Sequence, residues 1–469
     1  MNLTDQDRLR QISAQVCVIA MVCLSITAPA IVISSALPYF KIEQLLIPVA
    51  FAGYLWLLLA GISRTFRLNG MFLIGLLYFI CNLVSISYGA YLLGHPVILR
   101  DFYELPKVWL PVCFFTVAYE ANLSEAGLRR LMAALSFAAA AVCLYAWGQF
   151  VGLGITYKLN PFYSTGGHID QELEFARRVY ATVGNANVLG ALMSWCVVLF
   201  VLAALYGVGN RLRNTLVAFA CLITMIMTGS RYSIVTLSLG ILLIFLLASS
   251  VGRRSLPKLA LVLLMIPLVV WTYQTVATSN RRTLERYQTL HDPMQVDSLR
   301  QRLDILWPIA WEDVTKSPFV GHGPGKSFLS VGVALEGFID SEYLNVTREL
   351  GFVGLIVFLG YYCFPIYLMW KGQRTTRYMG NYLAEYAPAL LMTMQAGLIM
   401  GVLALVMNVG MSTFYMPFLQ GFLWLWLGIG ARSAINARAL FQLQSVAVAN
   451  PPPESQNELV NLNRIFLNS

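Results

Sequence analysis

The sequence predicts an all-α integral membrane protein with about twelve transmembrane helices, because runs of about 20 apolar residues, enough to cross a bilayer, recur along the chain. Of its 469 residues, 58% are hydrophobic and only 12% are charged, whereas a soluble domain carries about 25% charged residues. The mean hydropathy is +0.66. We therefore expect lipid to surround most of the chain.

The expected spans fit the hydrocarbon core, and the first is too long for the apolar part of a cleavable signal peptide. The run from Leu216 to Ser249 is too long for one helix and contains Thr228-Gly229-Ser230-Arg231. We divide it there, because an arginine at the bilayer centre costs about 2.5–3.5 kcal/mol or more. The predicted spans are 12–34, 43–62, 70–90, 105–119, 128–152, 182–206, 214–228, 231–250, 259–276, 346–370, 385–409 and 416–431.

Basic residues predict the orientation, because cytoplasmic loops of membrane proteins are rich in Lys and Arg. They occupy every second short connection. This side holds Arg8, Arg10, Arg64, Arg67, Arg129, Arg130, Arg211, Arg213, Arg253, Arg254, Lys258, Lys371, Arg374, Arg377, Arg432 and Arg438. We therefore expect it to face the cytoplasm with both chain ends, and the longer segments 153–181 and 277–345 to face the periplasm.

The predicted organisation divides the chain into four parts. They are spans one to nine over 1–276, a large periplasmic loop over 277–345, spans ten to twelve over 346–431, and a disordered cytoplasmic tail over 432–469. The loop is expected to be partly helical, because Leu299, Leu303 and Leu306 recur at helical spacing. Pro308 would bend this helix or mark its start, and a glycine-rich turn follows at 321–325.

Metal, redox and nucleotide chemistry are not expected. The eight cysteines lie in apolar runs without a CxxC pair, and the four histidines, His95, His168, His291 and His322, are scattered along the sequence. We find no P-loop or dinucleotide-binding spacing. The net charge of +9 is attributed to cytoplasmic loops rather than to nucleic-acid binding. We therefore predict no cofactor, no metal and no nucleic-acid partner.

Polar residues gather at four membrane boundaries on the predicted periplasmic side. They are Arg177 to Asn187, Ser230-Arg231, Arg300 and Arg302 with the glycine turn, and Asp340 to Leu344. Guanidinium forks bind phosphate oxygens through paired hydrogen bonds, and a carboxylate can take a proton from a hydroxyl. Together these groups suit glycosyl transfer from a lipid-linked pyrophosphate.

At these positions the sequence resembles the bacterial O-antigen ligase/polymerase family. The matching pieces, in family order, are Arg178 to Asn187, Ser230-Arg231, Arg302 to Phe328 and Asp340 to Gly354. The resemblance implies an inner-membrane glycosyltransferase with a periplasmic active face that uses neither metal nor cofactor. Its donor would be an undecaprenyl-pyrophosphate-linked glycan, and its acceptor a lipid-linked or lipid A-core glycan. A chain-length regulator protein is a further expected partner.

The resemblance also implies roles for individual residues. Arg178 and Arg231 would hold the pyrophosphate, and Asp340 would be the general base. The residues expected to bind substrate are Arg302, Glu342, Tyr343, His322 and Asn187. Simpler roles compete: Arg231 could snorkel at a helix end, Arg178 could be a solvated loop charge, Asp340 could cap the tenth span, and Glu342 could be the base instead.

The fourth motif separates the two branches of the family. Ligases typically carry His-Asn where this sequence has Asp340-Ser341, and Asp is commoner among polymerases. We therefore favour a polymerase of O-antigen or exopolysaccharide repeat units, with an O-antigen ligase as the alternative. A third hypothesis is a lipid-linked oligosaccharide flippase. The long loop counts against it, as does the lack of an evident inverted repeat, which transporters favour.

Overall fold

The computed structural model describes residues 5–31, 40–59, 70–97, 99–163, 178–248, 297–324, 340–411, 413–414 and 416–449. Within this part of the chain the fold is helical, as predicted, apart from one antiparallel pair of two-residue strands, β1 (Ala30–Ile31) and β2 (Phe40–Lys41). Segments 277–296 and 325–339 of the predicted periplasmic loop lie outside the described residues, as does the tail 450–469.

The described part of the chain consists mainly of helices. In chain order they are α1 (Asp5–Thr27), α2 (Ile42–Leu59), α3 (Gly70–Tyr91), α4 (Leu99–Lys107), α5 (Trp109–Glu120), α6 (Glu125–Val151), α7 (Gly154–Leu159), η1 (Asn160–Phe162), η3 (Ala181–Val183), α9 (Ala186–Tyr206), α10 (Arg211–Met227), α11 (Arg231–Ala248), α14 (Asp297–Gln301), η5 (Arg302–Leu306), α15 (Trp307–Lys316), α16 (Glu342–Tyr386), α17 (Pro388–Met407) and α18 (Pro417–Ala449).

Several helices are long and apolar enough to cross a bilayer. Among the described residues there are five of these, namely α3, α6, α9, α17 and the first part of α16, and shorter apolar helices lie at Ile12–Thr27 and Arg231–Leu247. Each predicted span overlaps a helix, except 259–276, which lies outside the described residues. The first predicted span, 12–34, extends past the end of α1 into β1, and 105–119 is divided between α4 and α5. The division at Thr228–Arg231 is also seen, since α10 ends at Met227 and α11 begins at Arg231. The total of twelve stays a prediction.

Two helices run past their predicted ends. α16 continues to Tyr386 and α18 to Ala449, so residues 432–449, expected to be part of a disordered tail, are helical. Hydropathy marks where a helix leaves lipid, but the backbone hydrogen bonding of a helix can continue into water. The prediction of disorder from residue 432 was therefore wrong for this stretch.

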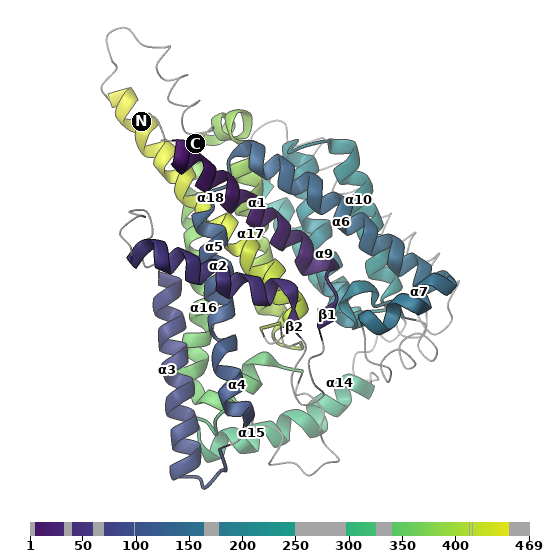
Figure 1. The fold of residues 1–469 in the computed structure, drawn as a ribbon, viewed down its shortest axis with the longest axis vertical. Coiled ribbons are helices and arrows are strands. Elements are labelled where there is room, and N and C mark those ends of the chain that lie inside the picture. Colours follow the sequence, from purple (N-terminus) through teal and green to yellow (C-terminus); the bar gives the residue numbers. More distant parts are fainter. Residues whose placement is uncertain are drawn as a thin grey trace.

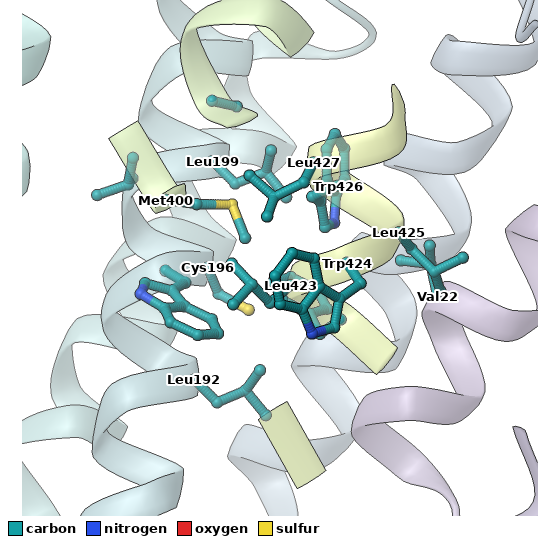
Figure 2. Packing of buried hydrophobic residues seen from close by; sticks show 14 of the residues in the cluster. Val22, Leu192, Cys196, Leu199, Met400, Leu423, Trp424, Leu425, Trp426 and Leu427 are labelled. Carbon is teal, nitrogen blue, oxygen red and sulfur yellow. The ribbon is translucent and has the colours of Figure 1, made fainter. Parts of the chain in front are cut away.

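The centre of the bundle is α9. It is apolar on every side, and each residue from Val188 to Tyr206 is buried, as expected for a helix without a polar face. It packs against α10, α11 and α17. Figure 2 shows Leu192, Cys196 and Leu199 of this helix facing Met400 and the aromatic rings of Trp424 and Trp426.

The loop helices lie at one end of this bundle. Figure 1 shows α14 and α15 lying across the lower end, with α15 beside α16, while the start of α1 and the end of α18 are near the upper end. The stretch 297–316 is helical throughout, as the leucine spacing predicted. Pro308 is the second residue of α15, directly after the π-helical turn η5, so it marks the start of this helix.

Candidate active site

Arg178 is held tightly between the entry to α9 and the end of α10. Its side chain is buried, with 6% exposed. Its Nε donates to the main-chain oxygen of Thr228 at 2.7 Å, and a terminal nitrogen donates to Oδ1 of Asn187 at 2.5 Å. Both of these acceptors are neutral, and the two bonds orient the guanidinium.

The turn from Thr228 to Arg231 is shaped to receive this arginine. Gly229 has a φ of +62°, a conformation that favours glycine, and a Cβ there would lie 3.6 Å from Nε of Arg178. Gly190 lets α9 approach, since a Cβ on it would lie 2.4 Å from Oγ of Ser233. Arg231 is the first residue of α11 and is half-buried. The fold thus brings Arg178 to the turn that carries Arg231.

The segment before α9 is fixed by a buried glutamine. Oε1 of Gln149 accepts hydrogen bonds from the main-chain N–H groups of Tyr180, at 3.2 Å, and Ala181, at 2.8 Å, while its Nε2 donates to Oδ1 of Asn160. Ala181 needs this support because its φ of +45° is strained for a residue with a Cβ. Gln149 was not among the predicted site residues, although a glutamine inside an apolar span signals a buried polar contact.

Asp340 forms an ion pair with Arg302, which lies 38 positions earlier in the sequence. Both side chains are partly exposed, 37% for Asp340 and 22% for Arg302. The helix α16 begins at Glu342, so Asp340 lies one residue outside the capping position. Its carboxylate faces Arg302, which is the first residue of the π-helical turn η5. Such turns are frequent at functional sites.

Glu342 and Tyr343 join the start of α16 to the end of α17. The Glu342 side chain is fully buried, and its main-chain N–H donates to the Asn408 oxygen at 2.9 Å. The Tyr343 hydroxyl donates to the main-chain oxygen of Leu405 at 2.6 Å, and the Tyr232 hydroxyl donates to the main-chain oxygen of Val406 at 2.6 Å. The last carbonyls of a helix lack partners within it, so the two tyrosines satisfy this helix end.

The glycine turn holds His322 against α16. The main-chain N–H of His322 donates to the main-chain oxygen of Arg348 at 3.0 Å, and that of Gly323 donates to the main-chain oxygen of Glu349 at 2.9 Å. Nε2 of the His322 ring is hydrogen-bonded to the main-chain oxygen of Asp313 at 2.7 Å. Nδ1 of the same ring is hydrogen-bonded to Nε2 of His95 at 3.3 Å. The two histidines are far apart in the sequence, and the fold brings them together across 227 positions.

Beneath this turn lies a buried ion pair that the sequence analysis did not single out. Arg348 bonds through Nε to Oδ2 of Asp313 at 3.2 Å, and both side chains are buried. Lys316 lies 3.5 Å from the same carboxylate. The hydrogen bond from Lys316 to Glu312, together with Asp313, raises the pKa of Lys316.

Within the described ranges no cluster of three or more metal-binding side chains occurs.

Comparison with known families adds an independent finding. Residues 216–359 match the family model described as O-antigen ligase. The matched region begins in α10, ends in α16, and includes Arg231, Arg302 and Asp340. Arg178 lies outside it. No curated protein matches the chain. The match supports the predicted resemblance to the O-antigen ligase/polymerase family.

Proposed function

From the premise that residues 216–359 carry the O-antigen ligase domain, we propose that this bacterial membrane protein polymerises undecaprenyl-pyrophosphate-linked repeat units of O-antigen or exopolysaccharide. The reaction takes place on the periplasmic face of the inner membrane. The family supports glycan transfer in general. The polymerase assignment is drawn from Asp340, which stands where ligases carry histidine.

The observation that carries this proposal is the contact of Arg178 with the turn before Arg231. Two arginines, one in the segment before α9 and one at the start of α11, lie at one end of the bundle, and the Arg178 side chain is oriented by two hydrogen bonds. A diphosphate presents several anionic oxygens, which suit guanidinium forks that stay charged at any physiological pH. We assign Arg178 and Arg231 to the donor's pyrophosphate.

The proposed step is one substitution at the anomeric carbon of the donor sugar. The acceptor hydroxyl oxygen forms the new C–O bond, the bond to the pyrophosphate oxygen breaks, and undecaprenyl pyrophosphate leaves with both bonding electrons. The hydroxyl proton passes to Asp340 as general base. The arginines stabilise the negative charge that grows on the leaving oxygen. Glu342, which is fully buried beside Asp340, is the competing base.

Substrate contacts complete the proposed site. Asn187 is exposed and already orients Arg178, so it can contact the donor beside the pyrophosphate. His322 and Tyr343 are each half-buried near the start of α16, and we assign them to sugar binding. A chain-length regulator is the proposed protein partner.

The direct test uses purified full-length protein in liposomes with lipid-linked repeat units isolated from the source strain. A polymerase lengthens the lipid-linked glycan, whereas a ligase, the alternative, transfers it only when lipid A-core is supplied. A flippase would do neither and would move the intact donor across the bilayer. Unchanged glycan length in the wild-type protein would overturn the polymerase proposal.

The matched variants are Arg231→Ala and Arg129→Ala. Arg129 is exposed and pairs with Glu125 on the surface of α6, so its loss removes a positive charge away from the proposed site. We expect Arg231→Ala to abolish chain extension and Arg129→Ala to leave it near the wild-type level. Normal extension by Arg231→Ala at normal protein levels would remove this residue from the mechanism.

A further inference from the structure

The ion pair between Arg302 and Asp340 joins the loop helix, the continuous helical stretch of α14, η5 and α15, to the residues just before α16. We propose that Arg302 is a positioning residue, which holds the carboxylate of Asp340 where it meets the acceptor hydroxyl, rather than a ligand of the donor's pyrophosphate. This inference rests on the proposed function, because it assumes that Asp340 is the general base. It assigns the loop helix a role in acceptor activation.

The backbone of Asp340 alone does not orient its side chain. The residue precedes α16, and the first N–H group of that helix, on Glu342, donates to Asn408 of α17. Asp340 is therefore outside the regular hydrogen bonding that fixes helical residues. Its carboxylate is 37% exposed, so a specific contact is needed to select one rotamer, and Arg302 provides it.

Arg302 is itself well placed for this role. It is the first residue of the π-helical turn η5, and its side chain is 22% exposed. The hydroxyls of Tyr232, the residue after Arg231, and of Tyr343 both donate to main-chain oxygens at the end of α17. The start of α11 and the start of α16 therefore meet at the end of α17, which places Asp340 and its partner Arg302 near the turn that carries Arg231.

The hydrogen bonding is compatible with a base held in this way. The bond from Arg302 goes to Oδ2 of Asp340, and an ionised carboxylate offers about four acceptor sites on two oxygens. The acceptor's hydroxyl proton can still go to Oδ1. By contrast, a guanidinium that neutralises a carboxylate offers less charge to a diphosphate, which makes a donor-binding role the weaker hypothesis.

The two roles make different kinetic predictions. Loss of a donor ligand raises the KM for donor, whereas loss of a positioning contact lowers kcat and leaves donor binding intact. A positioning role also requires Asp340, so the effect of an Arg302 variant should vanish once Asp340 can no longer act as a base. Donor-binding energy would be lost in either background.

The experiment measures kcat and donor KM in liposomes for Arg302→Gln, Arg302→Lys, Asp340→Asn and the double variant Arg302→Gln/Asp340→Asn. Binding of undecaprenyl pyrophosphate to the same purified proteins is measured separately. The matched control is Arg300→Gln, because Arg300 also pairs with an aspartate, Asp304, but is 72% exposed. Arg302→Lys keeps the charge, so it serves as a second variant if Arg302→Gln folds poorly.

We expect Arg302→Gln to lower kcat by about 10–100-fold, the scale of a misplaced catalytic group, with undecaprenyl pyrophosphate affinity within about threefold of wild type. Arg302→Lys should recover part of the loss, Arg300→Gln should behave as wild type, and the double variant should be no slower than Asp340→Asn. A raised donor KM with unchanged kcat, or an equal loss in the Asp340→Asn background, would overturn the inference. Failure of the proposed function would appear instead as an inactive wild type or an active Asp340→Asn.

Discussion

Arg178 and Arg302 lie at the same end of the molecule but in different kinds of surroundings. Arg178 is buried in the helical bundle and bonds to a main-chain oxygen and an amide oxygen. Arg302 lies on the loop helix, partly exposed, and pairs with a carboxylate. In the proposed mechanism the bundle holds the pyrophosphate, which every donor shares, and the loop handles the acceptor, which differs between polymerases and ligases.

The difference has a physical basis. Holding Arg178 in place costs little extra, because the bundle that surrounds it is already packed around α9. The loop helices contact the bundle mainly through α15 and α16, so they can vary in shape without disturbing the core. If the proposed mechanism holds, acceptor choice can change through the loop while the proposed pyrophosphate site stays the same.

The largest expected effect separates Asp340 from its neighbour Glu342. Asp340→Asn keeps the size of the residue but removes the base, so we expect transfer to fall by about 10²–10⁴-fold, with folding and undecaprenyl pyrophosphate binding preserved. Glu342→Gln should retain more activity. The measurement is chain extension by each purified protein. Near-normal extension by Asp340→Asn would make Glu342 the candidate base.

A second prediction concerns the contact between the glycine turn and α16. Gly351 has a φ of +68°, and a Cβ on it would lie 2.1 Å from the carbonyl carbon of Phe319. The N–H of the next residue, Phe352, leaves the helical pattern and donates to the Pro318 oxygen at 2.8 Å. Gly351→Ala must displace this turn, so we expect the variant to unfold at a lower temperature than wild type and to be cleaved faster by protease within the loop.

The control for Gly351→Ala is Gly94→Ala. Gly94 has a φ of +67°, and a Cβ on it would meet no atom within 4 Å, so this substitution adds backbone strain of about 1–2 kcal/mol without a clash. Gly351→Ala should therefore be clearly less stable than Gly94→Ala in the same membrane or detergent. Equal stability of the two variants would show that the turn does not depend on close packing at Gly351.

The smallest perturbation tests the orientation of the two regions. We expect Glu312→Cys on α15 to react with an impermeant thiol reagent added outside spheroplasts, and Leu212→Cys at the start of α10 to stay unlabelled. Both positions are exposed, at 70% for the Glu312 side chain and 68% for Leu212. A cysteine-free background is needed because Cys363 is also exposed. The reverse labelling pattern would show that the predicted orientation in the membrane is wrong.

The sequence predicted the features that depend on local composition. Apolar runs located the helices, and Arg231 located the break between α10 and α11 because lipid does not tolerate an arginine at its centre. The pieces around Arg178, Arg231 and Asp340 were found through family resemblance. The contact between Arg178 and the turn before Arg231 was expected from the membrane boundaries, and the meeting of these groups with Asp340 stays a prediction.

Contacts between distant parts of the chain could not be predicted in this way. His95 and His322, Asp313 and Arg348, and Arg302 and Asp340 meet only through packing, and none of these pairs has a periodic signal. Asp340 illustrates the limit. Its position before a span suggested a helix cap as readily as a base, and only the described start of α16 at Glu342 moves it away from the cap.

The central claim is that Arg178 and Arg231 bind the donor's pyrophosphate, and the affinity of purified protein for undecaprenyl pyrophosphate tests it most directly. We predict that Arg178→Lys and Arg231→Lys each weaken binding by about tenfold or more, because lysine keeps the charge but loses the paired hydrogen bonds of the guanidinium. Arg129→Lys should bind as wild type does. Equal affinity of all four proteins would contradict the account.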